Sequence, residues 1–275
     1  MTKWEEKKVS VFGLGKSGFA IIKKLKALGA EVFLTDSGKP DVESENALKE
    51  LKVKYEFEKH SEESISNKDL IVLSPGVNPS LPILKKAKEL NIPVISEIEL
   101  AYRFLSKSII AVTGTNGKTT TTTLIGEFLK AAGKKVAVAG NIGIPLVSID
   151  DTDLDFIVAE ISSYQLETIV TFRPWISLIL NLTEDHLQRH KTMDNYGIVK
   201  SKIFENQKKT DFLIYNAEDP IVSKLVLKSE ARLVPFYKHE AEKVLHIDSI
   251  DMKIKGEHNI ENALAASLAA KIAGV

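Results

Sequence analysis

The stretch IIAVTGTNGKTT, residues 109–120, joins an apolar run to a threonine-rich segment. A helical pattern of apolar residues follows over 124–129, so the order along the chain is strand, glycine loop, helix. This order is typical of a phosphate-binding loop, in which backbone N–H groups and the positive end of a helix cradle a polyphosphate. We therefore predict that this stretch binds a nucleoside triphosphate.

Two side chains of the loop have the chemistry that this prediction needs. Lys118 is placed to reach the outer phosphates, and the Thr119 hydroxyl is placed to bind Mg²⁺. Val112 stands where the common phosphate loop has its first glycine, which disfavours small GTPases and most motor ATPases. An ordinary Gly/Asn turn before a helix is the alternative interpretation. The predicted nucleotide-binding residues are Gly114, Thr115, Asn116, Gly117, Lys118, Thr119 and Thr120.

The composition limits the classes of protein and partner. Across 275 residues, 37 basic and 37 acidic side chains give a formal net charge of zero, so nothing indicates a nucleic-acid partner. Cysteine is absent, which excludes disulfides, thiol nucleophiles and cysteine metal sites. Residues 1–8 do not resemble a signal peptide, and no apolar run approaches the ~20 residues that span a bilayer. We expect a cytoplasmic monomer with no membrane partner.

The first 95 residues alternate between strand and helix patterns. Apolar strand patterns lie at 9–12, 31–36, 69–73 and 92–95, and an amphipathic helix pattern follows the first strand and stops at Gly29. Such alternation is typical of a parallel sheet with helices on its faces. We therefore predict a Rossmann-like α/β domain over residues 1–95.

The turn after the first strand carries a dinucleotide-type fingerprint. Gly13, Gly15 and Gly18 have the required spacing, and Asp36 lies at the end of the second strand. A nicotinamide cofactor would fit this turn, and so would the diphosphate of another nucleotide, such as a UDP-linked substrate. A tight turn that merely packs a helix on a strand is the third interpretation. The pattern alone does not separate these alternatives.

Residues 96–275 form the second predicted unit, a P-loop-type central α/β ATPase domain. Besides the glycine loop, it contains strand patterns at 135–139, 155–159 and 175–180. Asn141, Glu160 and Asn181 follow these strands closely. In an open α/β sheet the ligand crevice lies at the carboxyl ends of the strands, so these side chains should lie near the glycine loop.

Several polar residues of this unit have both a functional and a structural interpretation. Glu160 is suited to bind Mg²⁺, which prefers oxygen ligands, but it could also cap a helix or lie on the surface. His186 could bind a metal or a phosphate, although a single histidine in a loop is more often neither. By composition, Lys200 is a solvated lysine in a helix predicted over 195–206. Asn259 and Asn262 share a helix face and suit an adenine edge, whereas capping by Asn259 is the alternative.

The motifs together resemble a known family, the Mur ligases, which are the ATP-dependent amide ligases of peptidoglycan precursor synthesis. The resemblance covers essentially the whole chain, and the segment SSYQL at 162–166 resembles most closely the members that add D-glutamate. The motifs occur in the family's order: GLGKSG at 13–18, GTNGKTT at 114–120, GNIG at 140–143, Glu160 with SSYQL, NLTEDH at 181–186, and HNIEN at 258–262.

The resemblance implies a role for each matching residue. In the family the N-terminal domain binds the UDP of UDP-N-acetylmuramoyl-L-alanine, and the central domain binds ATP. The implied substrate-binding residues are Lys16, Ser17, Asp36, Ser37, Gly76, Asn141 and His186. The implied Mg²⁺ ligands are Thr119, Glu160, His186 and Lys200, and the implied adenine contacts are Asn259 and Asn262. The implied catalytic residues are Lys118, Glu160, His186 and Lys200.

The resemblance also implies that Lys200 is carbamylated. An ammonium group with a pKa of about 10.4 cannot bind a cation at neutral pH. Reaction with carbon dioxide converts the amine into an anionic oxygen ligand suited to Mg²⁺. The implied reaction activates the substrate carboxylate as an acyl phosphate, which the amine of D-glutamate then attacks, with positioning and charge neutralisation as the main sources of catalysis.

One expectation concerns the end of the chain. Family members carry a third domain after the His-Asn helix, whereas this chain ends at Gly274-Val275. We therefore expect a truncated form that lacks the C-terminal amino-acid-binding domain, binds the UDP precursor, and does not ligate D-glutamate by itself. The alternatives are an L-alanine-adding Mur ligase, a non-catalytic nucleotide-binding fragment, and a nicotinamide dehydrogenase. Folylpolyglutamate ligases are disfavoured, because they lack a first domain of this type.

Overall fold

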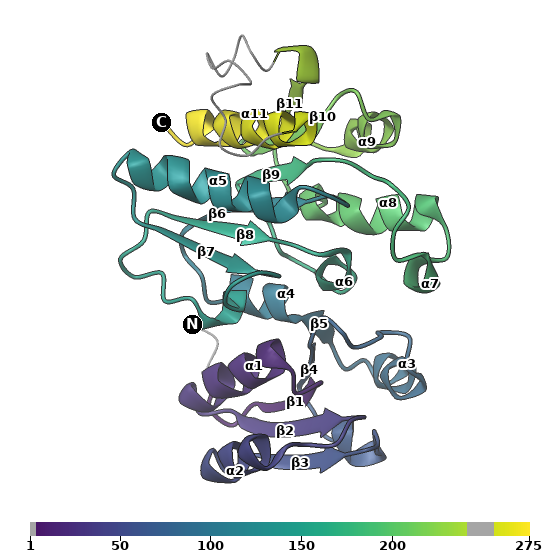
Figure 1. The fold of residues 1–275 in the computed structure, drawn as a ribbon. Coiled ribbons are helices and arrows are strands. Elements are labelled where there is room, and N and C mark those ends of the chain that lie inside the picture. Colours follow the sequence, from purple (N-terminus) through teal and green to yellow (C-terminus); the bar gives the residue numbers. More distant parts are fainter. Residues whose placement is uncertain (1–3, 241–255) are drawn as a thin grey trace. The chain divides into compact units, whose positions relative to one another are not determined.

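The computed structural model describes residues 4–240 and 256–275, and the chain divides into two compact units (Figure 1). The first unit comprises Met1–Phe104 together with two short later segments, Pro145–Ser148 and Glu167–Val170. The second comprises Leu105–Ile144, Ile149–Leu166 and Thr171–Val275. Each unit contains one parallel sheet with helices, which confirms the predicted fold class of a Rossmann-like domain followed by a P-loop-type α/β domain.

The first unit contains a 5-stranded parallel sheet in the order β3-β2-β1-β4-β5. Its central strands are buried nearly throughout, as expected for a sheet covered on both faces. The order reverses between β1 and β4, which is where Rossmann-type sheets bind their ligands. Its elements are β1 (Lys8–Phe12), α1 (Lys16–Ala27), β2 (Glu31–Asp36), α2 (Val42–Glu50), β3 (Lys54–Phe57), β4 (Leu70–Leu73), α3 (Pro82–Glu89), β5 (Val94–Ser96) and α4 (Glu97–Tyr102).

The fingerprint glycines each meet a different local requirement. Gly13 has a φ of 87°, in the left-handed region that favours glycine. A Cβ added to Gly18 would lie 1.9 Å from the Gly13 carbonyl oxygen, so α1 packs against the turn only because this side chain is absent. Gly15 has nothing within 4 Å of such a Cβ, so the backbone there faces open space. These are the features that allow a diphosphate to approach a helix N-terminus closely.

Buried carboxylates join the two later segments to the first unit. Glu97 and Glu99, both on α4, are 0% exposed. The backbone N–H of Val147 donates to Glu97 Oε1 at 2.7 Å, and that of Val170 donates to Glu99 Oε2 at 3.0 Å. Because buried carboxylates need hydrogen-bond donors, these contacts explain why segments so distant in sequence belong to this unit.

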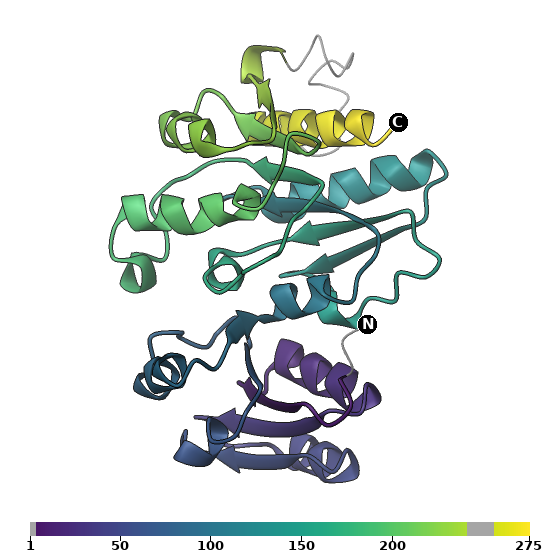
Figure 2. The same cartoon turned by 180° about the vertical axis from the view of Figure 1, so that it is seen from behind.

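The second unit contains a 6-stranded parallel sheet in the order β11-β10-β9-β6-β8-β7. Its core lies between the sheet and the helices α5 and α11, which run side by side in both views (Figures 1 and 2). Its elements are β6 (Ser108–Thr113), α5 (Lys118–Ala131), β7 (Val136–Gly140), β8 (Phe156–Glu160), α6 (Ser163–Leu166), β9 (Ile176–Ile179), α7 (Leu187–His190), α8 (Met193–Ser201), β10 (Phe212–Asn216), α9 (Pro220–Leu225), β11 (Arg232–Phe236) and α11 (Glu257–Ile272).

Two predicted boundaries are wrong for physical reasons. The helix predicted over 195–206 begins at Met193, because the Thr192 side chain caps it by accepting from the Asn195 N–H. Its α-helical part ends at Ser201, and a 3₁₀ turn continues to Phe204. The strand predicted over 92–95 begins at Val94, since Pro93 has no N–H to donate to the sheet.

Within the described ranges, no helix is long and apolar enough to cross a lipid bilayer.

Candidate functional site

The glycine loop lies between the end of β6 and the start of α5, as predicted. Gly117 has a φ of 81° and immediately precedes α5. Lys118 bends back over the loop, and its Nζ donates to the carbonyl oxygens of Thr115 at 2.7 Å and Gly114 at 3.1 Å. Burial lowers the pKa of this ammonium group. The loop therefore holds a partly desolvated cation at the N-terminus of a helix, which favours a bound anion.

An asparagine from a neighbouring strand end holds the loop in shape. The backbone N–H of Asn116 donates to Asn181 Oδ1 at 2.8 Å, and Asn181 Nδ2 donates to the Asn116 carbonyl at 3.1 Å. The Thr115 N–H donates to the Asn181 carbonyl at 2.9 Å. This two-point amide contact fixes the loop before any ligand is bound. The predicted position of Asn181 near the loop is thus confirmed.

Thr119, Glu160 and Asn141 come together at the carboxyl ends of the strands. Thr119 Oγ1 donates to Glu160 Oε2 at 2.7 Å, and Asn141 Nδ2 donates to Glu160 Oε1 at 2.7 Å. Glu160 is 2% exposed and is the last residue of β8, and α6 begins only at Ser163, so Glu160 is neither a surface charge nor a helix cap. Within residues 4–240 and 256–275, no group of three or more His, Cys, Asp or Glu side chains could hold a metal. The hydroxyl–carboxylate pair fits Mg²⁺, which takes few protein ligands alongside phosphates and water.

Lys200 is buried, which contradicts the interpretation of this residue as a solvated lysine. It is 1% exposed, and its Nζ donates to the Gly114 carbonyl at 2.8 Å, the same oxygen that Lys118 approaches. The pKa of Lys200 is lowered to about 7, mainly by burial and secondly by the nearby positive charge of Lys118. No local pattern around Lys200 signals this burial, because Thr113 and Gly114, which its Nζ contacts at the end of β6, are distant in the chain.

His186 lies at the N-terminus of α7 with a φ of 53°. Its Nε2 is 3.4 Å from Asp185 Oδ2, and its ring centroid is 5.0 Å from that of Tyr164. The side chain is 44% exposed, unlike Glu160 and Lys200. The His186 side chain is therefore exposed to solvent, next to the Asp185 carboxylate and the Tyr164 ring, where a ligand can contact it.

Asn259 and Asn262 are buried between α11 and α5. Thr121 Oγ1 donates to Asn262 Oδ1 at 3.3 Å, and Asn262 Nδ2 donates to Asn259 Oδ1 at 3.4 Å. The helix begins at Glu257 with Gly256 in the capping position, so the alternative in which Asn259 caps α11 is wrong. A Cβ at Gly117 would lie 2.2 Å from Asn262 Oδ1. The Asn262 side chain therefore packs closely against the glycine loop at Gly117. The contacts of Asn259 and Asn262 with adenine stay a prediction.

This contact predicts the effect of filling the Gly117 position. We expect Gly117→Ala to weaken ATP binding by about tenfold or more, because the new Cβ displaces the Asn262 amide and shifts the loop. Gly133→Ala is the matched control, since Gly133 has a similar φ of 78° but nothing within 4 Å. Titration calorimetry with ATP measures the affinity. Equal losses in both variants would show that left-handed backbone strain, and not the Asn262 contact, causes the effect.

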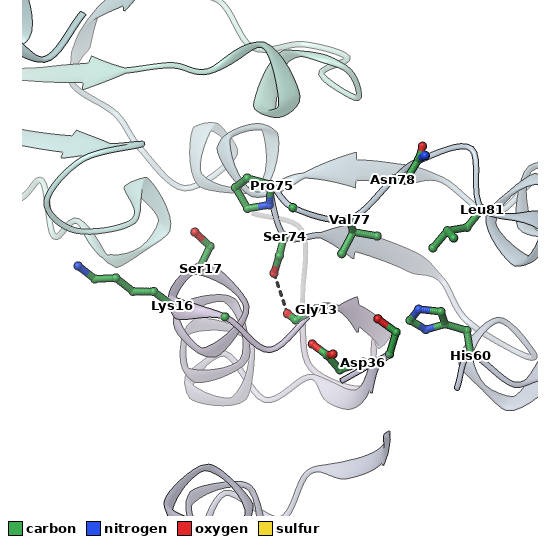
Figure 3. A pocket seen from close by; sticks show the side chains of 13 residues that line it. Gly13, Lys16, Ser17, Asp36, His60, Ser74, Pro75, Val77, Asn78 and Leu81 are labelled. Carbon is green, nitrogen blue, oxygen red and sulfur yellow. Dashed lines mark hydrogen bonds between the residues drawn. The ribbon is translucent and has the colours of Figure 1, made fainter. Parts of the chain in front are cut away.

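The first unit has a pocket of about 580 Å³ at the carboxyl ends of its strands (Figure 3). It brings together every first-unit residue predicted to bind substrate: Lys16, Ser17, Asp36, Ser37 and Gly76. Asn141 and His186, also predicted to bind substrate, belong to the second unit. The lining residues that sequence reasoning missed are His60, Ser74, Pro75, Val77, Asn78 and Leu81.

Asp36 shapes this pocket through both of its carboxylate oxygens. Oδ2 accepts from the Leu14 N–H at 2.6 Å, and Oδ1 accepts from the Gly38 N–H at 2.6 Å. On the other side, Ser74 Oγ donates to the Gly13 carbonyl at 2.7 Å (Figure 3). The position of Ser74, directly after a buried strand, was the signal that could have found it. The glycine turn is therefore held from both neighbouring strands.

Both units match known protein families, and curated relatives match nearly the whole chain. Residues 112–270 match the Mur ligase middle domain, and residues 7–96 match the Mur ligase MurD-like N-terminal domain. The UDP-N-acetylmuramoylalanine–D-glutamate ligase of Thermoanaerobacter pseudethanolicus is 46% identical over 98% of this chain and 64% of the relative. The ligase of the same name from Koribacter versatilis is 43% identical over 94% of this chain and 62% of its own length. The chain thus spans less than two thirds of these relatives.

Solved structures share the fold at lower identity. The UDP-N-acetylmuramate:L-alanyl-γ-D-glutamyl-meso-diaminopimelate ligase of Neisseria meningitides gives a TM-score of 0.67 at 19% identity, covering 98% of this chain and 94% of that one. The UDP-N-acetylmuramate–alanine ligase MurC of Thermotoga maritima gives 0.53 at 22% identity, covering 98% and 65%. These likenesses show that the chain shares the fold of these proteins, with a parallel sheet in each unit, and nothing finer.

Proposed function

The chain belongs to the Mur ligase family, and from this premise we propose that it serves the ATP-dependent addition of D-glutamate to UDP-N-acetylmuramoyl-L-alanine. The observation that carries the proposal is the convergence of Lys118 and Lys200 on the Gly114 carbonyl, in the same loop region as the Thr119–Glu160 pair. This arrangement suits a triphosphate whose terminal phosphoryl group is transferred. The choice of D-glutamate rests on the names of the relatives that are 46% and 43% identical.

In the proposed reaction, the substrate carboxylate takes the terminal phosphoryl group of ATP and becomes an acyl phosphate. The amine then attacks the acyl carbon, and phosphate leaves. Lys118 neutralises charge that develops on the phosphoryl oxygens, and the backbone N–H groups of the loop orient them. Asn181 keeps the loop rigid, so little reorganisation is needed during transfer. We propose that this reaction takes place in the cytoplasm.

We propose Thr119 and Glu160 as the protein ligands of Mg²⁺. The ion, when bound, neutralises charge on the transferring phosphoryl group. Asn141 donates to the other Glu160 oxygen, which holds the carboxylate in the orientation that faces Thr119. His186 is proposed as a further contact to the ion or to the substrate, because its ring is accessible and supported by Asp185.

Trapping the acyl phosphate tests the proposed function. The chain is incubated with ATP, Mg²⁺ and UDP-N-acetylmuramoyl-L-alanine, and hydroxylamine converts any acyl phosphate into a stable hydroxamate. We expect a hydroxamate with this substrate and none with UDP-N-acetylmuramate. Activation of UDP-N-acetylmuramate instead would favour the L-alanine-adding reaction. If the chain binds ATP and the UDP-linked compounds but activates neither carboxylate, the result would favour a non-catalytic nucleotide-binding unit. Phosphate release that depends on D-glutamate measures the second half of the reaction.

We also propose that Lys200 carries a carbamate in the active protein. A buried ammonium group is costly, so burial favours the deprotonated, neutral amine of Lys200. The neutral amine is the form that reacts with carbon dioxide, and burial lowers the pKa of Lys200 to about 7. The carbamate would place an anionic oxygen near the glycine loop, where Mg²⁺ and phosphates meet.

We expect carbon NMR with isotope-labelled bicarbonate to give a carbamate signal that grows as the pH rises through 7. The sign follows from the lowered pKa, because deprotonation of Lys200 increases the reactive amine. Lys200→Met should remove the signal, whereas Lys202→Met, at a nearby residue on the following 3₁₀ turn, should leave it. A wild-type spectrum without the signal at any pH would show that Lys200 acts as an amine.

A further inference from the structure

His60 lies in the first-unit pocket on the side opposite Lys16, with Asp36 between them (Figure 3). Its ring is held from two directions. Nδ1 is 2.8 Å from Thr35 Oγ1, and the ring stacks on that of Phe12 with centroids 5.1 Å apart. Phe12 and Thr35 are both 0% exposed. The imidazole is therefore fixed in position before any ligand enters the pocket.

The contacts of Thr35 determine which imidazole nitrogen carries the proton. Thr35 Oγ1 has a single hydrogen, and its other neighbours, Glu56 Oε1 at 2.8 Å and the Lys59 carbonyl at 3.1 Å, can only accept. Burial alone would raise the pKa of Glu56, but hydrogen bonds from Ser61 and Thr35 outweigh it and lower that pKa, so Glu56 is ionised. Because the hydroxyl hydrogen goes to these acceptors, the Thr35 oxygen accepts from Nδ1–H of His60.

A neutral imidazole protonated at Nδ1 presents Nε2 as a hydrogen-bond acceptor. Among residues 4–240 and 256–275, His60 Nε2 has no hydrogen-bond partner, although the ring lines the pocket. Val77 and Leu81 line the same part of the pocket and offer apolar surface (Figure 3). A flat ring with an N–H on its edge is the kind of ligand that fits such surroundings.

The geometry of the pocket orders the parts of a bound nucleotide. The diphosphate belongs at the glycine turn, where the N-terminus of α1 offers backbone N–H groups. The sugar follows near the end of β2, as in other sheets of this type. His60 lies on the far side of Asp36 from Lys16, so a base beyond this sugar would extend toward His60 (Figure 3).

We propose that His60 selects the base of the nucleotide-linked substrate, with Nε2 accepting a hydrogen bond from the ring N–H of uracil. This inference rests on the proposed function for the presence of a uridine diphosphate. Cytosine has an unprotonated ring nitrogen at the same position, so it would oppose acceptor to acceptor. A site built to hydrogen-bond one group rejects the analogue that lacks it, because the buried partner is left unpaired. His60 is thus a specificity-determining residue.

Calorimetric titration of the chain with UDP and with CDP tests the inference. We expect the wild type to bind UDP about tenfold or more tightly than CDP. His60→Asn keeps a donor toward Thr35 but lacks the atom that corresponds to Nε2, so UDP binding should weaken and the ratio should fall to about one. His60→Gln places an amide oxygen near the Nε2 position and should restore part of the preference for UDP. His239→Phe, at an exposed histidine of the second unit, is the control and should leave the ratio unchanged.

The outcomes separate this inference from the proposed function. Equal affinities of the wild type for UDP and CDP, a preference for CDP, or an unchanged ratio in His60→Asn would overturn the role of His60 while leaving a nucleotide site in place. Failure of the wild type to bind either nucleotide would overturn both, because the pocket would then hold no pyrimidine diphosphate.

Discussion

Replacing Lys118 with methionine is expected to weaken ATP binding by about 100-fold or more. Methionine keeps most of the length and apolar volume of the side chain and removes only the charge and its donors. In the protein, Lys118 Nζ lies 2.7 Å from the Thr115 carbonyl and 3.1 Å from the Gly114 carbonyl. When a triphosphate binds, its oxygens offer the ammonium group stronger, charged acceptors than these carbonyls.

Lys130→Met is the matched control for this substitution. Lys130 lies on the same helix, is exposed, and pairs with Glu127 Oε1 at 3.0 Å. Exposed pairs of this kind contribute little, so ATP affinity should stay within about twofold of the wild type. Calorimetry with ATP and Mg²⁺ gives both affinities. If Lys118→Met binds ATP as tightly as Lys130→Met, the loop does not hold the triphosphate as proposed.

Gly18→Ala is expected to lower the free energy of unfolding by about 3 kcal/mol. The added Cβ would lie 1.9 Å from the Gly13 carbonyl oxygen and 2.8 Å from Ser74 Oγ. A backbone carbonyl cannot rotate away as the end of a side chain can, so α1 must move as a unit. That movement also opens the turn in which the diphosphate is proposed to lie, and UDP affinity should fall with stability.

Gly15→Ala separates the two effects at the neighbouring fingerprint glycine. No atom lies within 4 Å of a Cβ at Gly15, so stability should change by no more than about 1 kcal/mol. The methyl group would nevertheless project where the diphosphate approaches the backbone, and UDP affinity should fall about tenfold. Chemical denaturation and calorimetry measure the two quantities. A stable Gly18→Ala protein would contradict the close packing of α1 on the turn.

Local requirements explain why much of the fold was predictable. The glycine turns at Gly13 and Gly117 need backbone conformations that other residues rarely adopt, and each joins a buried apolar strand to a helix. The position of Glu160 was also predictable, because a carboxylate at the carboxyl end of a buried strand lies at the ligand edge of a parallel sheet. These signals are contained in short stretches of sequence.

Other features depend on contacts between distant residues, and no short stretch contains them. Strands β10 and β11 were not predicted, and β11 is an edge strand with partly exposed residues and Pro235. The local sequence around Lys200 is that of an ordinary exposed helical lysine, and its burial depends on contacts with Thr113 and Gly114 at the end of β6. His60 acquires its fixed ring only because Thr35 and Phe12, on separate strands, are brought beneath it.

The buried carboxylates of Glu97 and Glu99 limit how the first unit can be grafted or exchanged. Each binds a backbone N–H supplied from beyond residue 140, in Val147 and Val170. A gene fusion cut at residue 104 would remove both donors, at a cost of about 1–3 kcal/mol for each carboxylate. This unit is consequently not a portable module in the sense of a continuous gene segment. A chimaeric protein that keeps it intact must carry its two short inserts from the same parent.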